Sequence, residues 1–148
     1  MKRLKQNGMA LAVLMASSLF ISSGIAAPDA PPNNTQTAKP HRYIAEGKIV
    51  QVTFGDFAFR LDFTDSQTMT FTGNGPASQG ITDTVRYTAV EIRPQVYMVY
   101  WHEPGTGDNV THVQDYPRGI VYTNIASGDG SFTHLTGQIK IIGNSGEQ

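Results

Sequence analysis

Short runs of alternating apolar and polar residues fill the chain from Lys48 onward. The clearest run is residues 57–64, where Phe or Leu at every second position alternates with smaller or polar residues. A period of two over this length predicts a strand with one buried face. Turn residues precede it at Gly55-Asp56 and follow it at Asp65-Ser66. Residues 48–54, 57–64 and 67–72 are therefore predicted to form three consecutive antiparallel strands.

The stretch from Thr84 to Ile125 predicts four further strands, because Val, Ile, Tyr, Thr and Trp dominate its runs. Three groups of turn residues divide it: Arg93-Pro94-Gln95, Pro104-Gly105-Thr106-Gly107 and Tyr116-Pro117-Arg118-Gly119. Proline fixes φ and glycine tolerates positive φ, as tight turns require. Residues 74–82 contain Gly75, Pro76 and Gly80 and are expected to form the one long loop, and residues 132–142 the last strand.

About eight short antiparallel strands in roughly 100 residues can pack as a closed barrel or as a two-sheet sandwich. Sequential hairpins favour the barrel, because a meander brings its first and last strands together and removes both sheet edges. The expected fold is therefore all-β, a small up-and-down antiparallel barrel. A barrel of eight strands is either filled by side chains or holds one small ligand.

The hairpin centred on residues 104–107 indicates which side chains share a face. A four-residue loop pairs Glu103 with Asp108, Trp101 with Val110, Val99 with His112 and Tyr97 with Gln114. The opposite face carries Met98, Tyr100, His102, Asn109, Thr111 and Val113. The first set mixes aromatic and polar side chains, as ligand cavities do, so it is the expected inner face.

The N-terminus has the pattern of an export signal. Lys2, Arg3 and Lys5 precede an apolar run that ends in small residues near Ala27, which predicts a signal peptide over residues 1–27. Residues 28–41 are rich in proline and polar side chains, so a disordered leader is expected there, followed by one barrel domain over residues 42–148. The predicted location is periplasmic or secreted, with no membrane attachment after cleavage.

Charge and composition exclude several kinds of partner. Removing the signal leaves eight Lys and Arg against 12 Asp and Glu, a net charge of −4 with no basic run, which argues against nucleic-acid binding. The chain has no cysteine, so no disulfide can stabilise an exported domain. His102, His112 and His134 lack the spacing of a metal site, and neither a metal nor a cofactor is expected.

Residues 84–93 and the segment from Val96 to Pro104, Val-Tyr-Met-Val-Tyr-Trp-His-Glu-Pro, resemble the core of the molybdenum-cofactor-biosynthesis protein F-like (MoaF-like) domains. More distantly, residues 55–59 and the Trp-x-Glu-Pro turn resemble the bacterial phenolic acid decarboxylases. Both families have a lipocalin-like (calycin) β-barrel with an internal pocket. The resemblance covers most of residues 48–125 and implies the same fold here.

The decarboxylase resemblance places Trp101 and Glu103 in a substrate cavity. In that family an arginine and several tyrosines beside the glutamate engage the substrate carboxylate. An ungapped comparison puts Gln51, Thr53 and Phe59 where tyrosines stand, and it does not bring Arg86 onto the arginine. No catalytic set is identified beyond Glu103 as a single candidate, and whether the protein is an enzyme stays open.

Three classes of function remain. The first is binding of a small aromatic or acyl-type ligand inside the barrel, with Tyr97, Trp101, Glu103, His112 and Arg86 as expected ligand-binding residues and Arg86 able to clamp an anion beside Glu103. The alternatives are a decarboxylase or lyase acting on a small phenolic acid, and an interaction module. The third class would use an outer apolar strip of Val96, Met98 and Tyr100, which is also compatible with a homodimer.

Overall fold

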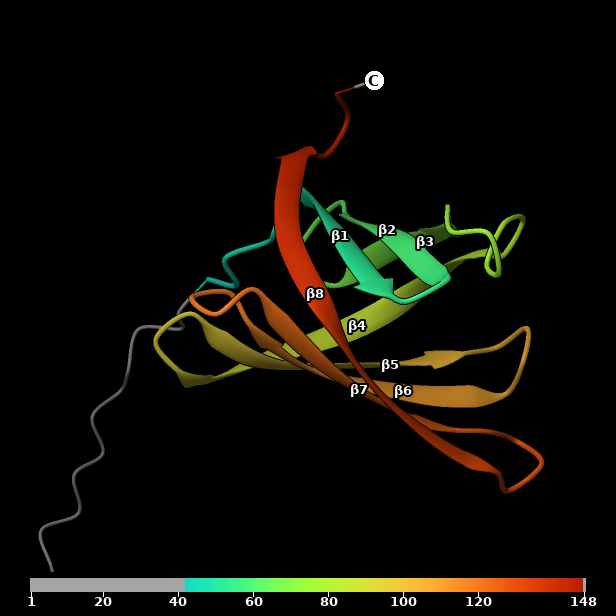
Figure 1. Cartoon of the computed structure of the whole chain (residues 1–148). Coiled ribbons are helices and arrows are strands. Elements are labelled where there is room, and N and C mark those ends of the chain that lie inside the picture. The colour runs from blue at the N-terminus through green and yellow to red at the C-terminus, as the bar shows by residue number, and fades with distance from the viewer. Residues whose placement is uncertain (1–41, 148) are drawn as a thin grey trace, which may run out of the picture. The chain divides into compact units, whose positions relative to one another are not determined.

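The computed structural model describes residues 42–147, which fold into a closed barrel of antiparallel strands (Figure 1). The predictions for the signal peptide and the leader lie outside these residues. The strands are β1 (Lys48–Phe54), β2 (Phe57–Phe63), β3 (Thr68–Gly73), β4 (Thr82–Arg93), β5 (Val96–Glu103), β6 (Asp108–Asp115), β7 (Ile120–Ala126) and β8 (Phe132–Asn144). Among residues 42–147 no helix is long and apolar enough to cross a membrane.

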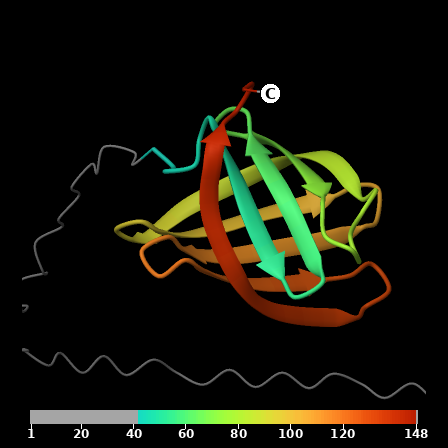
Figure 2. The same cartoon turned by 45° about the horizontal axis from the view of Figure 1, so that its top comes forward.

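Each strand pairs with the next along the chain, and β8 pairs with β1 to close the barrel (Figure 2). This confirms the predicted up-and-down meander of eight strands. The β5–β6 register is also as predicted: Tyr97 lies opposite Gln114, Val99 opposite His112, and Trp101 opposite Val110. These side chains are all buried, so the set of residues expected to face inward does so.

The outer apolar strip expected on β5 is shorter than predicted. Tyr100 is exposed and Met98 is half-buried, but Val96 is only 4% exposed. Val96 pairs with Arg93 on one side and with Asp115 on the other. Arg93 Nη2 donates to Asp115 Oδ2 at 2.9 Å, so an ion pair spans Val96 and covers it.

A tyrosine from the segment before β1 plugs one end of the barrel. Residues 42–47 lie at the end that also carries the β4–β5 and β6–β7 turns (Figure 1). Tyr43 packs there edge-on against Phe63 and Tyr97, with ring centroids 5.0 Å away in both cases, and lies 5.9 Å from Tyr87. Its side chain fills the space that the strands leave between them, so this end of the barrel interior is closed.

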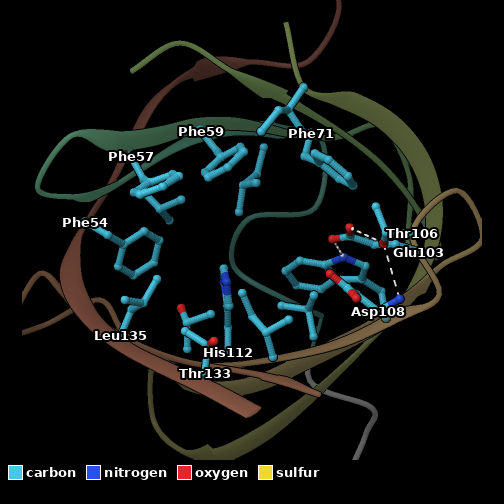
Figure 3. Close-up of a pocket in the computed structure, with 17 residues that line it drawn as sticks. Phe54, Phe57, Phe59, Phe71, Glu103, Thr106, Asp108, His112, Thr133 and Leu135 are labelled. Atoms are coloured by element: carbon cyan, nitrogen blue, oxygen red, sulfur yellow. Dashed lines mark hydrogen bonds between the residues drawn. The ribbon is translucent and has the colours of Figure 1, made fainter. Parts of the chain in front are cut away.

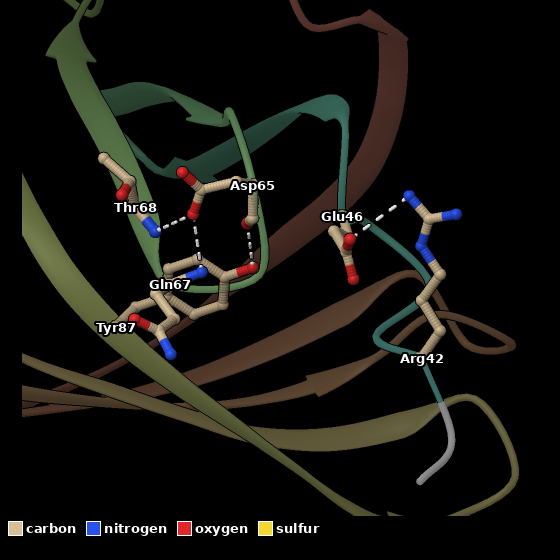
Figure 4. A network of polar contacts seen from close by, with 6 residues as sticks. All are labelled: Arg42, Glu46, Asp65, Gln67, Thr68 and Tyr87. Atoms are coloured by element: carbon tan, nitrogen blue, oxygen red, sulfur yellow. Dashed lines mark hydrogen bonds and ion pairs between the residues drawn. The ribbon is translucent and has the colours of Figure 1, made fainter.

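The β2–β3 turn at the same end is held by hydrogen bonds to one residue (Figure 4). Asp65 Oδ1 accepts hydrogen bonds from the backbone amides of Gln67 and Thr68, both at 2.7 Å. These bonds lower the pKa of the Asp65 carboxyl below its usual value. The Tyr87 hydroxyl donates to the backbone oxygen of Asp65 at 2.7 Å, which ties the turn to the core tyrosine below it.

At Gly137, β8 passes very close to β1, the strand with which it closes the barrel. A Cβ atom at this position would lie 2.2 Å from the backbone oxygen of Thr53 and 2.5 Å from Cδ1 of Phe54. No side chain fits in that space without moving backbone. Glycine at position 137 therefore lets β8 pass close to β1 and lets the Phe54 ring pack against it.

Candidate functional site

The end of the barrel opposite Tyr43 contains a cavity of about 400 Å³. It opens among the β1–β2, β3–β4, β5–β6 and β7–β8 connections, which an up-and-down barrel places at a common end. Its volume lies within the range of small-molecule sites, and most of its lining is apolar. The cavity is therefore the candidate functional site of the described residues.

Aromatic rings make up much of the cavity wall. Phe54, Phe57, Phe59 and Phe71 gather along one side of the cavity and face His112 and Thr133 on the other (Figure 3). They belong to β1, β2 and β3, where the alternation of apolar and polar residues turns them inward. Trp101 of β5 completes the aromatic lining. A planar ligand would find ring faces and ring edges on several sides.

Two carboxyl side chains lie at the mouth. Glu103 ends β5 and Asp108 begins β6, directly opposite each other across the ladder, and both line the cavity beside Thr106 (Figure 3). Trp101 Nε1–H donates to Glu103 Oε1 at 3.0 Å, and the Thr106 hydroxyl donates to Glu103 Oε2 at 3.3 Å. Burial raises the pKa of the Glu103 carboxyl, the two hydrogen bonds partly oppose this, and Asp108 and Asp83 raise the pKa further.

His112 lies on the floor of the cavity. It stands two inward positions deeper on β6 than Asp108, is only 3% exposed, and packs edge-on against Trp101 with ring centroids 4.8 Å apart. Burial lowers the pKa of the imidazole to about 3, because the charged ring would lose its hydration with no carboxylate bonded to it. His112 is therefore neutral at physiological pH.

A buried hydrogen-bond network determines which nitrogen of His112 carries the proton. The Tyr43 and Tyr116 hydroxyls both donate to Gln114 Oε1, the latter at 2.9 Å. The amide nitrogen of Gln114 consequently faces His112 Nδ1, at 3.3 Å. An amide nitrogen only donates, so Nδ1 accepts and the proton of the neutral ring is on Nε2. Within the described residues Nε2–H has no hydrogen-bond partner, and it is the donor left for a ligand.

Thr123 adds a second polar group to the floor. It lies directly opposite His112 across the β6–β7 ladder and lines the cavity. Its Oγ1 is buried and has no hydrogen-bond partner among the described residues. A buried hydroxyl without a partner costs on the order of 1–3 kcal/mol. Rotation about χ1 exchanges its hydroxyl with its methyl group, so a ligand on the floor can supply the missing bond.

Three of the five residues expected to bind a ligand line the cavity: Trp101, Glu103 and His112. Tyr97 shares their face but lies at the plugged end, in contact with Tyr43 rather than with the cavity. Arg86 lies between the inward residues Val85 and Tyr87, so it points out of the barrel, where its guanidinium donates to Gln67 Oε1. An anion clamp between Arg86 and Glu103 is therefore wrong.

Among residues 42–147, the arginine and tyrosines that a phenolic acid decarboxylase would use are missing from the cavity, although Glu103 is present. No arginine, lysine or tyrosine of these residues lines it, so none of their cationic side chains pairs with a substrate carboxylate there. The phenylalanine wall and Thr123 were not predicted from the sequence. The alternation of residues 57–64 put Phe57 and Phe59 on an inner face, but it did not show which end of the barrel is open. Thr123 could have been found by extending the β5–β6 register one strand further.

The comparison with curated proteins finds no match. The comparisons with solved structures and with protein families both agree with the barrel fold. Among solved structures, a crystal structure from Burkholderia vietnamiensis described as a "putative beta-lactamase" is similar, with a TM-score of 0.64 and 20% identity. The likeness covers 68% of this chain and 98% of that one, and at this identity it shows the fold alone. The MoaF-like family matches residues 46–140. The chain therefore belongs to the MoaF-like family.

Proposed function

We propose that this protein binds a small, largely apolar organic molecule inside its barrel and releases it unchanged. The observation that carries the proposal is the cavity of about 400 Å³ with aromatic walls and a few convergent polar groups on its floor. Cavities of this kind are the usual place for a small ligand in a β-barrel. Filling it removes apolar surface from water and satisfies the Thr123 hydroxyl.

The residues around the cavity support binding more than catalysis. Among the described residues its only ionisable lining side chains are Glu103, Asp108 and His112, and the imidazole is held neutral by burial. No serine or lysine of the part of the chain that the structure describes lines the cavity, so these residues do not supply there the serine nucleophile and lysine of β-lactam hydrolysis. The resemblance to a structure named for that activity therefore supports the barrel and not the reaction. Export to the periplasm or the medium is part of the proposal.

Titration with N-phenyl-1-naphthylamine, a neutral aromatic dye that emits strongly in apolar surroundings, tests the proposal. Bound dye lies near Trp101, so Trp101 emission falls as dye emission rises. Val110→Phe puts a larger side chain into the cavity and is expected to weaken binding at least tenfold. Val113→Phe makes the same change on the same strand but on the outer face, and is expected to leave binding within twofold.

Circular dichroism and urea unfolding establish that both variants are folded. Equal binding by Val110→Phe and Val113→Phe would place the dye outside the barrel and overturn the proposal. A second probe is the small neutral phenol 4-ethylphenol. If neither this compound at millimolar concentration nor an excess of the dye changes the Trp101 emission of the folded wild-type protein, and the dye emission does not rise, the proposal is overturned as well.

A further inference from the structure

The polar groups of the cavity are divided between its two ends, and they differ in character. The mouth has two negatively charged hydrogen-bond acceptors, Glu103 and Asp108, beside the Thr106 hydroxyl, which already donates to Glu103, and Asp83 is near enough to Glu103 to raise its pKa. The floor has the neutral donor His112 Nε2–H and the partnerless hydroxyl of Thr123. Between them the walls are apolar and aromatic.

Within residues 42–147, no lysine or arginine lines the cavity to balance the negative charge at its mouth. The Glu103 carboxylate accepts hydrogen bonds only from the neutral donors Trp101 and Thr106 among the described residues. A carboxylate ligand would bring a second negative charge to this partly dehydrated position. An ammonium group would meet two carboxylates there, in surroundings where charge pairs are less screened than in water.

The floor favours a hydroxyl group. His112 Nε2–H can donate to an oxygen, while the Thr123 hydroxyl can accept from it or donate to it. A phenolic hydroxyl both accepts and donates, so it can satisfy the two groups together. Carbonyl and ether oxygens can use only the donors.

The spacing of the two ends fits a short molecule. His112 lies four residues along β6 from Asp108, roughly 13 Å at the usual rise of a strand. Side chains reaching in from both ends leave room for one aromatic ring with a short substituent on either side. The four phenylalanines and Trp101 line the same cavity.

From this arrangement we infer that the cavity selects small aromatic amines with a hydroxyl at the far end of the ring. The ring lies among the phenylalanines and Trp101, the hydroxyl meets His112 and Thr123 on the floor, and the ammonium meets Glu103 and Asp108 at the mouth. The inference rests on the proposed function, because it specifies the chemistry of the ligand that the barrel binds.

Four probes of one ring size test it by isothermal titration calorimetry at pH 7 and constant salt. They are tyramine, 2-phenylethylamine, 4-ethylphenol and 3-(4-hydroxyphenyl)propanoate. Tyramine is expected to bind at least tenfold more tightly than the carboxylate. Removing the hydroxyl, as in 2-phenylethylamine, is expected to weaken binding about tenfold, because the floor groups then lose their partner.

Matched variants separate local charge from overall charge. In the double variant Glu103→Gln, Asp108→Asn the preference for tyramine over the carboxylate is expected to fall below threefold. Asp56→Asn removes a charge from the exposed β1–β2 turn at the same end, outside the cavity lining, and is expected to keep the full preference. Thr123→Val is expected to reduce the advantage of tyramine over 2-phenylethylamine.

The outcomes distinguish this inference from the proposed function. If 4-ethylphenol binds and the carboxylate binds as tightly as tyramine, the amine selectivity is overturned while small-molecule binding stands. Equal loss of the preference in Asp56→Asn and in the double variant would also overturn it, because the effect would then come from net charge. If none of the four probes binds a folded protein, both the inference and the proposed function fail.

Discussion

Gln114 Nε2 lies 3.3 Å from His112 Nδ1, and this contact connects the plugged end of the barrel with the floor of its cavity. On one side of Gln114 the hydroxyls of Tyr43 and Tyr116 donate to its amide oxygen. On the other side His112 faces the ligand cavity. Because each group orients the next, the protonated nitrogen of His112 depends on a tyrosine that lies outside the strands.

The buried imidazole predicts a loss of stability in acid. The pKa of His112 is about 3 in the folded protein and 6.5 in the unfolded chain, so below pH 6.5 the unfolded state binds one more proton. The free energy of unfolding then falls by about 1.4 kcal/mol per pH unit, or about 3 kcal/mol between pH 6.5 and pH 4. Urea unfolding at several pH values measures this slope.

The variant His112→Gln removes that contribution, and its unfolding free energy should vary less with pH by about this amount. The groups that face the ring are Trp101, Phe54, Gln114 and Thr123, none of which titrates in this range. Glu103, reached through Trp101, has a raised pKa and acts in the opposite direction, and it is present in both proteins. His134→Gln on exposed β8 is the control. Parallel pH profiles for wild type and His112→Gln would contradict the prediction.

Because Tyr43 plugs one end of the barrel, its ring and its hydroxyl are both expected to stabilise the folded protein. Tyr43→Phe keeps the packing against Phe63 and Tyr97 but leaves Gln114 Oε1 with Tyr116 alone, so about 1 kcal/mol of stability should be lost. Tyr43→Ala also empties the end of the barrel and should cost about 3–5 kcal/mol. Urea denaturation provides both values.

The matched control for Tyr43→Phe is Tyr122→Phe, because the Tyr122 ring is exposed on the outer wall of β7. It should change the unfolding free energy by less than about 0.5 kcal/mol. If Tyr43→Ala unfolds at the same urea concentration as wild type, then residues 42–47 do not close the barrel in solution.

The central hairpin could be predicted to the residue, because a four-residue turn and a period of two leave one register for β5 and β6. The same alternation could have corrected Arg86, which lies between two apolar positions, Val85 and Tyr87, and so had to point outward. The local alternation of apolar and polar residues shows whether a side chain points into or out of the barrel. It does not show how deep the residue lies along the barrel axis. Tyr97 was therefore grouped with Trp101, although Tyr97 lies at the plugged end and Trp101 lines the cavity at the other end.

The plug could not be predicted because it depends on contacts between distant residues. Tyr43 lies 71 residues from Gln114 in sequence, and the segment around it has no strand period. Which end of an eight-stranded barrel stays open is decided by such contacts. The burial of Val96 could not be predicted for a similar reason, since the ion pair beside it joins Arg93 to Asp115, 22 residues further along the chain.

The N-terminal pattern predicts that the exported protein begins near Pro28. Expression of the full chain in a Gram-negative host, followed by intact-mass analysis of the periplasmic fraction and the medium, measures the start directly. A substitution of Leu14 by Arg interrupts the apolar run and should retain the precursor inside the cell. Membrane-bound protein whose mass includes residues 1–26 would show that the segment is not cleaved.

The close approach at Gly137 predicts that barrel closure tolerates no side chain there. In Gly137→Ala the new Cβ would meet the Thr53 oxygen at 2.2 Å and Phe54 Cδ1 at 2.5 Å, so the backbone of β1 and β8 must separate and the Phe54 ring must also be displaced. Strain of this kind typically costs about 1–3 kcal/mol in a packed core, and the contact with backbone places Gly137→Ala at the upper end. Urea unfolding measures the loss.

Gly143→Ala is the matched control on the same strand, because its Cβ would meet only Ile49 Cδ1, at 3.8 Å, which is ordinary contact. It should leave stability within about 0.5 kcal/mol of wild type. Phe54 also lines the cavity, so a displaced ring in Gly137→Ala should weaken binding of N-phenyl-1-naphthylamine as well as stability. If Gly137→Ala were as stable as Gly143→Ala and bound the dye equally well, β1 and β8 could not approach each other as closely as described, and the link between barrel closure and the cavity wall would be wrong.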